Sequence, residues 1–319
     1  MDKKSPFSSV QLITITDAQA GQRLDNFLIK SLKTLPKSRL YRIIRKGEVR
    51  VNKKRIKPEY KLKAGDLLRL PPLQIDAQND DQVQIPDRLK ELLESRILYE
   101  DEHILVLNKP EGLAVHTGSG LKYGVIDVLR PLRAGTDLEL VHRLDRDTSG
   151  CLLLAKNRHA LLEMQRMLQD NSMRKNYRAL VKGHWNPDLH RIELPLLKQT
   201  MPNGERRVYV DERGQKSDTR IRKISHYTQQ GLQYSLLEIS LMTGRTHQIR
   251  VHCQSQQHEI AGDDKYGDRQ FNRDIKSLGC NRLMLHACSL EIPANDHTKK
   301  LLIEAAEPVE FRNLLQHEA

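Results

Sequence analysis

Long apolar runs and aromatic side chains are scarce in this sequence of 319 residues. No stretch approaches the roughly 18 consecutive apolar residues that indicate a transmembrane helix. The opening segment MDKKSPFSSV lacks the apolar core of a secretory signal peptide. Aromatic residues make up only 4%, which argues against the bulky anchors of a helix that lies on a membrane surface. We therefore expect a cytoplasmic protein that does not associate with membranes.

Cysteine pairs and other metal-ligand patterns are absent as well. Cys151, Cys253, Cys280 and Cys288 form no C-x-x-C pair, so we expect free thiols in a reducing compartment rather than a metal site or a disulfide. No H-E-x-x-H pattern is present. No glycine-rich loop leads from a strand into a helix, which argues against a dinucleotide or P-loop site. The residues thus predict no bound metal.

Acidic residues are outnumbered by basic ones. The 41 Asp and Glu residues stand against 53 Lys and Arg, which gives a formal net charge of +12. An excess of this size favours polyanionic partners, and nucleic acid fits best. Charge alone does not distinguish RNA from DNA.

The basic excess is concentrated in residues 37–57, where ten basic residues accompany one acid, Glu48. Apolar spacing predicts a helix before this stretch and a second helix within it, followed by short strands. A basic surface on one side suits phosphate binding, whereas a face that only aids solubility normally mixes both charge signs. The residues expected to bind phosphates are Lys37, Arg39, Arg42, Arg45, Lys46, Lys53, Lys54 and Arg55.

The order RLDNFL, KSRLYRIIRKGEVRVNKKRIK and AGD over residues 21–71 resembles the S4 RNA-binding domain. The resemblance implies structured RNA as the ligand; the alternative is a basic surface that only keeps the protein soluble. We place the S4-like domain at residues 20–83, after an N-terminal segment of residues 1–19. Residues 84–96, which contain the helical segment DRLKELLES, are expected to form a linker.

Residues 97–319 are predicted to form a larger domain of the α+β class. Strand-like segments dominate, as in ILYEDEHILVLNKP, which is typical of two strands joined by a tight turn. Helical periodicity is rarer and is clearest in HALLEMQRMLQD. We therefore expect a mixed, mostly antiparallel β-sheet with flanking helices.

The segment HRLDRDTSG (142–150) combines acids, bases and turn-forming residues between two apolar, strand-like stretches. Asp145 and Asp147 alternate here with Arg143 and Arg146. Neighbouring cations lower the pKa of a carboxylate, which suits an ionised nucleophile better than a proton donor. Two carboxylates could also serve a glycosidase, and a salt-bridged surface turn explains the same pattern.

Five segments, one of which contains HRLDRDTSG, occur in the order found in RluA-type pseudouridine synthases, which the chain resembles over residues 20–305. They are NKPEGLAVH, VHRLDRDTSGCLLLAK, KNYRALVKG, TGRTHQIRVH and NRLMLHA. Enzymes of this family break the bond between uracil N1 and the ribose, turn the base and rejoin it through C5. The resemblance implies an isomerase that requires no cofactor.

The resemblance also assigns roles to residues. Asp145 matches the essential carboxylate, and Arg245 matches the arginine that pairs with it and keeps it charged. Tyr177 matches the tyrosine that packs on the target base, and Arg143 matches the residue that helps extrude the nucleotide. Leu283 is expected to line the base pocket, although an ordinary core position explains it nearly as well.

Three other residues of these motifs are expected to have no catalytic role. His142 and His247 are expected to make structural hydrogen bonds, and Cys151 to act as a small hydrophobic residue.

The implied partner is large-subunit ribosomal RNA, bound by a monomer that does not act on DNA. A transfer-RNA synthase and a non-catalytic RNA-binding or chaperone protein are the alternatives.

Overall fold

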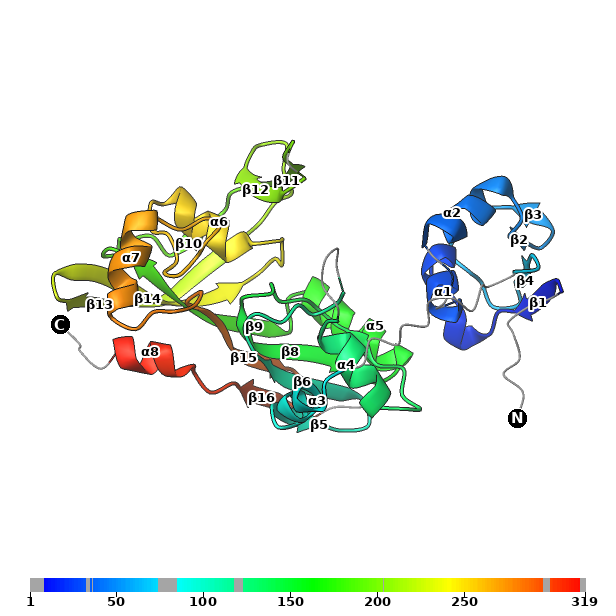
Figure 1. Cartoon of the computed structure of the whole chain (residues 1–319), viewed down its shortest axis with the longest axis horizontal. Helices are drawn as coiled ribbons and strands as arrows, with labels where there is room; N and C mark the ends of the chain where they lie inside the picture. The colour runs from blue at the N-terminus through cyan, green and yellow to red at the C-terminus, as the bar shows by residue number, and fades with distance from the viewer. Residues whose placement is uncertain are drawn as a thin grey trace. The chain divides into compact units, whose positions relative to one another are not determined.

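The chain divides into two units, Met1–Gln84 and Ile85–Ala319 (Figure 1). The computed structural model describes residues 9–32, 35, 37–73, 85–117, 123–202, 204–294 and 299–315. Within these ranges, no helix combines the length and the apolarity needed to cross a membrane.

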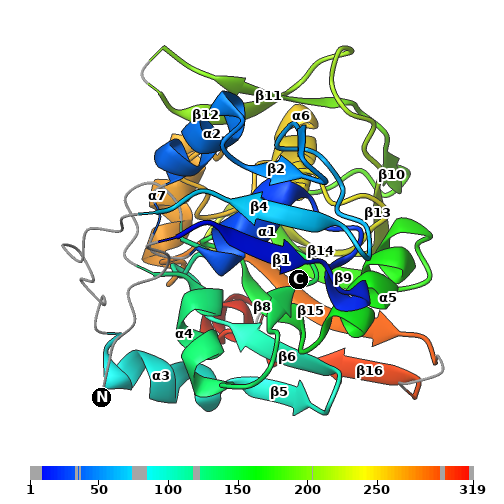
Figure 2. The same cartoon turned by 90° about the vertical axis from the view of Figure 1, so that its right-hand side faces the viewer.

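In its described residues, the smaller unit contains two α-helices and a small antiparallel sheet (Figure 2). Its elements are β1 (Gln11–Thr14), α1 (Leu24–Ser31), α2 (Lys37–Lys46), β2 (Arg50–Val51), β3 (Lys54–Arg55) and β4 (Leu67–Leu70), with a 3-10 turn at Asp17–Gln19. The strand order is β1–β4–β2–β3. Leu24 and Leu28 of α1 share a core with Leu40 and Ile44 of α2, because residues four apart lie on the same helix face.

The basic residues predicted to bind phosphates lie on α2 and around the turn from β2 to β3. The apolar positions of α2 face the core, and Arg42, Arg45 and Lys46 on the other side of the helix project into solvent. Exposed side chains are those of Arg42, Arg45, Lys46, Lys53, Lys54 and Arg55, and Arg39 is half-buried. Lys37 begins α2, but its side chain lies outside the described part of the chain.

The smaller unit begins before residue 20. Strand β1 lies within the predicted N-terminal segment 1–19, yet it pairs with β4 along its whole length, from Gln11 opposite Leu70 to Thr14 opposite Leu67. Backbone hydrogen bonds to a strand about 50 residues away fix this segment, and alternation in a four-residue stretch is too weak a pattern to reveal them.

Within the described ranges, the larger unit contains one ten-stranded sheet and a separate hairpin. The strands of the sheet are β5 (Ile97–Glu100), β6 (Ile104–Lys109), β7 (Glu139–Leu140), β8 (Ser149–Ala155), β9 (Arg174–Lys182), β10 (Arg191–Ile192), β13 (Thr219–Gln229), β14 (Leu232–Leu241), β15 (Leu285–Ile292) and β16 (Leu301–Glu304). Their order is β10–β13–β14–β9–β15–β8–β6–β5, with β16 beside β15 and β7 beside β8. Strands β8 and β15 are parallel, and the other pairs are antiparallel. The predicted α+β class with a mixed, mostly antiparallel sheet is confirmed.

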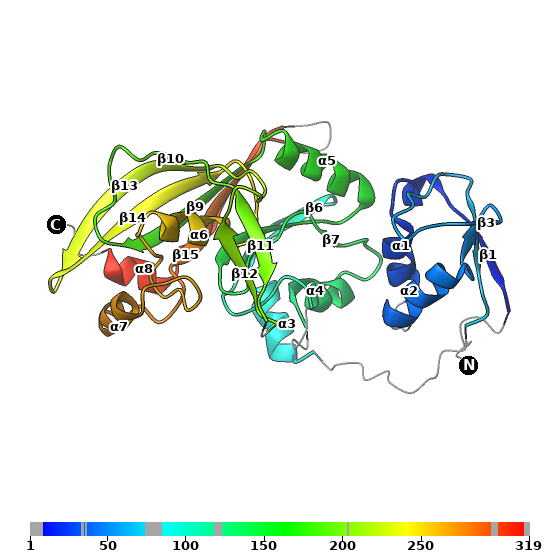
Figure 3. The same cartoon turned by 90° about the horizontal axis from the view of Figure 1, so that it is seen from above.

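Helices flank this sheet, and the hairpin stands away from it (Figures 1 and 3). The helices are α3 (Asp87–Glu94), α4 (Val125–Leu132), α5 (Arg158–Gln169), α6 (Gln248–Ser255), α7 (Arg269–Ser277) and α8 (Val309–Leu314), and the hairpin strands are β11 (Leu196–Thr200) and β12 (Arg206–Val210). Side chains of α4 pack with one face of β6 and β8, and side chains of α5 pack with the other. These two strands are therefore apolar at nearly every position, as expected for strands buried on both faces.

Helix α3 falls within the predicted linker 84–96 but belongs to the larger unit. The helix itself is confirmed. Arg133 joins it to the sheet, since its guanidinium pairs with Glu94 at 2.6 Å and with Glu100 at 2.9 Å. These partners are more than 30 residues from Arg133 in the chain, so no local pattern predicts that α3 docks here.

Candidate active site

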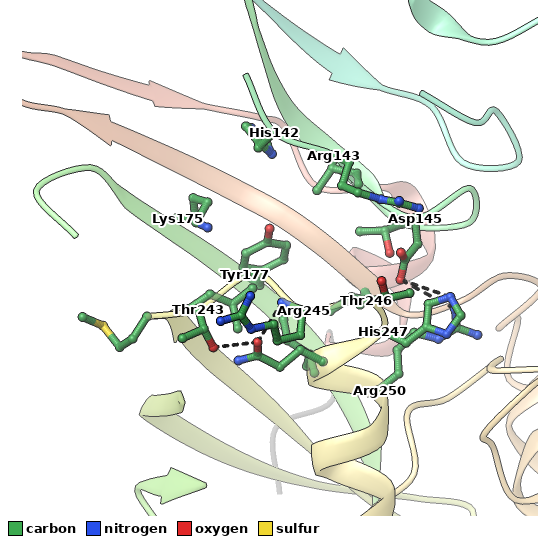
Figure 4. A pocket seen from close by; sticks show the side chains of 18 of the residues that line it. His142, Arg143, Asp145, Lys175, Tyr177, Thr243, Arg245, Thr246, His247 and Arg250 are labelled. Atoms are coloured by element: carbon green, nitrogen blue, oxygen red, sulfur yellow. Dashed lines mark hydrogen bonds and ion pairs between the residues drawn. The ribbon is translucent and has the colours of Figure 1, made fainter. Parts of the chain in front are cut away.

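A cavity of about 440 Å³ opens where three of the motifs meet (Figure 4). The loop before β8 contributes one wall, β9 a second, and the turn from β14 into α6 a third. The lining side chains that can ionise are His142, Arg143, Asp145, Lys175, Tyr177, Arg245, His247 and Arg250. Segments about 100 residues apart in the chain thus bring a carboxylate, a phenol and several cations together.

The loop that carries Asp145 is held by the strand that follows it. Gly150, the second residue of β8, has a φ of 108°, a value that side chains other than hydrogen rarely permit. A Cβ at this position would lie 2.2 Å from the carbonyl oxygen of Ala287 in the parallel neighbour β15. Glycine is therefore required for β8 to approach β15, and this approach fixes where the loop ends.

Asp145 lies at the wall of the cavity with its side chain 17% exposed. Its Oδ2 is 3.7 Å from Nη1 of Arg250 and 3.9 Å from Nε2 of His247 (dashed lines in Figure 4). One carboxylate oxygen thus faces two nitrogen groups while the side chain still reaches the cavity. Arg143, two residues earlier, is exposed beside the same cavity.

Arg250 is itself held by a second carboxylate. Its Nε and Nη2 each donate to Asp263 at 2.7 Å, and both side chains are almost fully buried. Burial alone would raise the pKa of Asp263, but the hydrogen bonds and charge of Arg250, together with backbone hydrogen bonds from Lys265 and Tyr266, outweigh it, so this pKa lies below its usual value. The ring of Tyr266 lies 5.1 Å from the guanidinium carbon of Arg250. Arg250 therefore presents its remaining nitrogen, Nη1, to Asp145 in a fixed geometry.

The arginine beside Asp145 is thus Arg250, and the predicted pairing with Arg245 is corrected. Arg245 is exposed, and its Nε donates to the carbonyl oxygen of Lys216 at 3.2 Å. Among the described residues, no ion pair joins Arg245 to Asp145. The two arginines differ because Arg245 lies in the turn before α6, whereas Arg250 lies inside that buried helix.

Tyr177 lines the cavity from β9 and is 6% exposed. Burial raises the pKa of its hydroxyl, so the phenol stays neutral. Lys175 lies two residues earlier, and alternate residues of a strand point to the same side. One edge of the cavity therefore combines a flat aromatic ring with an amine, as Figure 4 shows.

Leu283, the predicted pocket residue, is 4% exposed and packs within the main core. Among the described residues that line the cavity, Leu285 takes the place expected for it. Leu283 lies before β15, whereas Leu285 is the first residue of this strand, and of the two only Leu285 lines the cavity.

His142 and His247 both make hydrogen bonds. Nε2 of His142 accepts from the backbone amide of Leu153 at 3.2 Å, and burial lowers the pKa of this histidine to about 3. His142 is therefore a neutral acceptor that ties the loop to β8. His247 instead faces Asp145, a placement that the sequence did not indicate.

Lys109, at the end of β6, is a further residue that the sequence did not single out. It is fully buried, and its Nζ donates to the carbonyl oxygens of Pro110, Leu113 and Arg146 at 2.7–2.9 Å. Burial lowers the pKa of Lys109 to about 7. Because Arg146 follows Asp145 directly, this amine fastens the loop that carries the carboxylate.

Lys109→Met should remove a fully buried amine and leave three partly buried carbonyl oxygens without their donor. We expect the free energy of unfolding to fall on the order of 3 kcal/mol, and the catalytic rate to fall because the loop is released. Lys156→Met is the matched control, since its Nζ donates to the carbonyl oxygen of Asp101 and pairs with Glu100 far from the loop. Urea unfolding and single-turnover rates of both variants test this; equal rates in the two would contradict the role of Lys109.

The described part of the chain contains no cluster of three His, Cys, Asp or Glu residues that could hold a metal ion. The four cysteines are free thiols. Burial raises the pKa of Cys151 to about 12, so this thiol beside the loop is neutral and is not a nucleophile.

Comparison with known proteins identifies the family. Residues 103–255 match the RNA pseudouridylate synthases, and residues 22–68 match the S4 domain. Ribosomal large subunit pseudouridine synthase C of Haemophilus influenzae is 47% identical, covering 97% of this chain and 95% of its own length. The Escherichia coli protein of that name is 49% identical over 98% of both chains. Human RNA pseudouridylate synthase domain containing 4, a solved structure, gives a TM-score of 0.58 at 28% identity, covering 72% of this chain and 95% of its own. The chain therefore belongs to the RNA pseudouridylate synthase family.

Proposed function

We propose that this protein converts uridines of large-subunit ribosomal RNA to pseudouridine and that Asp145 supplies the reacting carboxylate. The observation that carries the proposal is one partly exposed carboxylate, held by Arg250, at the wall of a cavity that Tyr177 also lines. The relatives are ribosomal large subunit pseudouridine synthases, which supports large-subunit ribosomal RNA as the substrate. The reaction breaks the C1′–N1 bond and forms a C1′–C5 bond; C5 releases its proton and N1 takes one up, so the change is an isomerisation that needs no oxidant, reductant or net water.

The carboxylate of Asp145 can act by attack on the ribose C1′, by attack on the uracil C6, or by removing a ribose proton. Each route requires an ionised oxygen at a fixed position. Arg250 helps to fix that position, because its Nη1 lies 3.7 Å from Asp145 and its guanidinium is anchored at its other edge by Asp263. The ring of Tyr177 offers a surface on which the uracil can stack, and its neutral hydroxyl can donate a proton.

The reacting nucleotide must leave its helix, because C1′ and C6 are hidden in stacked RNA. A cavity of about 440 Å³ lies in the range of small-ligand pockets and accommodates a single nucleoside. Arg143 is exposed at its edge, where it can occupy the space that an extruded nucleotide leaves. We propose that Arg143 has this role, and that one monomer acts on RNA rather than on DNA in the cytoplasm.

The smaller unit is proposed to hold the RNA by its phosphates. Replacing Arg42, Arg45 and Lys46 of α2 together by Gln removes three exposed cations. We expect weaker RNA binding and a plot of log Kd against log salt that is shallower by roughly 2, since each phosphate contact contributes about 0.7–0.9 to the slope. The rate at saturating RNA should not change. An unchanged salt slope would show that α2 is not the docking surface.

Purified protein incubated with large-subunit ribosomal RNA, and in parallel with transfer RNA, tests the proposed substrate. Pseudouridine is measured by mass spectrometry of the digested RNA. We expect formation in ribosomal RNA alone. Formation in transfer RNA alone would favour the transfer-RNA alternative, and RNA binding without any isomerisation would favour a non-catalytic protein.

A further inference from the structure

The hydrogen bonds of Tyr266 fix the position of a proton next to Asp145. The backbone N–H of Val208, in strand β12, donates to the Tyr266 hydroxyl oxygen at 3.0 Å. The same oxygen lies 2.7 Å from Nδ1 of His247. An amide N–H can only donate, so it satisfies the oxygen as an acceptor and leaves the hydroxyl proton in need of a partner.

Within the described part of the chain, the Tyr266 hydroxyl has a single acceptor for this proton, Nδ1 of His247. If Nδ1 instead carried a proton, two donors would converge on the hydroxyl oxygen, and the hydroxyl proton would have no acceptor in a buried site. The neutral ring of His247 therefore carries its proton on Nε2. A histidine has two distinct nitrogens, and the bond made by one sets the state of the other.

The Nε2–H of His247 faces Asp145. Its nitrogen lies 3.9 Å from Oδ2, and a shift of roughly 1 Å would bring it into hydrogen-bond range. Burial lowers the pKa of His247, so the ring is neutral near pH 7 and the tautomer decides which nitrogen is a donor. The other charged groups around this ring are Arg250, Asp263 and Lys265.

The backbone of His247 adopts a strained conformation that directs its ring toward Asp145. Its φ is 53°, a left-handed conformation that is uncommon for residues other than glycine. His247 directly precedes α6, so the sharp turn allows both its side chain and that of Arg250 to reach Asp145. The Tyr266 ring contacts both, edge-on against His247 at 5.3 Å and beside the guanidinium of Arg250 at 5.1 Å.

We propose that His247 is a positioning residue for the Asp145 carboxylate, and that Tyr266, anchored to hairpin β11–β12 through the Val208 amide, holds it in the Nε2–H tautomer. The proposal rests on the proposed role of Asp145. In it, His247 supplies a directed N–H that orients the carboxylate oxygen when substrate is bound. The hairpin does not line the cavity, but it contributes to the site indirectly. The Val208 amide orients the Tyr266 hydroxyl, which in turn orients His247.

Tyr266→Phe tests the proposal, because it keeps the ring and removes only the hydroxyl. ¹⁵N NMR of the imidazole distinguishes the tautomers. We expect wild-type His247 as Nε2–H and a mixture of tautomers in the variant. The single-turnover rate at saturating RNA should fall about tenfold, as expected when one hydrogen bond worth about 1.4 kcal/mol is lost, with little change in Kd for RNA. Tyr234→Phe is the matched control, since the buried hydroxyl of Tyr234 donates to the Leu314 carbonyl outside the cavity.

A second pair of variants tests His247 directly. His247→Gln can place an N–H near the position of Nε2, whereas His247→Leu removes it, so Gln should retain more activity. A wild-type ring protonated on Nδ1, a Tyr266→Phe rate equal to that of Tyr234→Phe, or equal activity of the Gln and Leu variants would overturn the proposal. A different result would show that Asp145 is not the reacting carboxylate. In that case Asp145→Asn would remain active, whichever tautomer His247 adopts.

Discussion

Asp145→Asn should abolish pseudouridine formation while RNA affinity stays within several-fold of wild type. The amide keeps the size of the side chain but removes the charged oxygen that all three possible routes require. Loss of an essential nucleophile or base lowers the rate by about four orders of magnitude or more. Single-turnover isomerisation and RNA binding, measured on the same preparation, test both halves of this expectation.

Asp147→Asn is the matched control for this variant. Asp147 lies two residues further along the same loop, where it pairs with Arg146 at 2.8 Å and is 38% exposed. Surface ion pairs of this kind contribute little to stability, so we expect nearly normal rates. Turnover in Asp145→Asn, or equal loss in both variants, would contradict the assignment of Asp145 as the reacting carboxylate.

Arg250→Met should strongly destabilise the larger unit. The substitution leaves the buried Asp263 without its bidentate partner and removes the cation beside Asp145. Removing one partner of a buried ion pair costs about 3–5 kcal/mol. The isomerisation rate of the folded fraction should fall as well, because Asp145 loses the group that holds it.

Arg245→Met distinguishes the two arginines of the TGRTHQIRVH motif. Arg245 is exposed and makes no ion pair with Asp145 among the described residues, so the free energy of unfolding should change by no more than about 0.5 kcal/mol. RNA affinity can decrease, since Arg245 lines the cavity. Urea unfolding of both variants is the measurement. A destabilised Arg245→Met beside a stable Arg250→Met would contradict the pairing seen in the structure.

The sequence predicted those features that are encoded locally. The apolar run of β6 and the helical spacing of α5 are visible within about ten residues, and both elements form as expected. The loop of Asp145 and the strand of Tyr177 were found by their resemblance to family motifs, and the structure places both residues at one cavity. Such features need no knowledge of distant partners.

The features that the sequence did not predict depend on distant contacts. Arg245 and Arg250 lie in the same motif, and only the start of α6 and the position of Asp263 determine which of them reaches Asp145. Leu283 and Leu285 likewise differ only by where β15 begins. Element boundaries of this kind are uncertain from sequence by two residues or more, which is the whole separation between the two leucines.

Lys109, His247 and Tyr266 carry no pattern that marks them as site residues. A buried lysine can be recognised only when its carbonyl acceptors are known, and the tautomer of His247 only when the Tyr266 hydroxyl and the Val208 amide are placed. No sequence pattern predicts the left-handed backbone conformation of His247 either, because residues other than glycine rarely adopt it. These contacts belong to the folded structure.

We propose that Asp145 supplies the carboxylate for uridine isomerisation in large-subunit ribosomal RNA, and this proposal can be tested in cells. Its most direct test is a map of pseudouridine by carbodiimide-stop sequencing, in cells that lack the protein and in the same cells supplied with wild type or Asp145→Asn. We expect specific stops in large-subunit RNA to disappear without the protein, to return with wild type and to stay absent with the variant. An unchanged map in the cells that lack the protein, or stops restored by Asp145→Asn, would contradict the proposal.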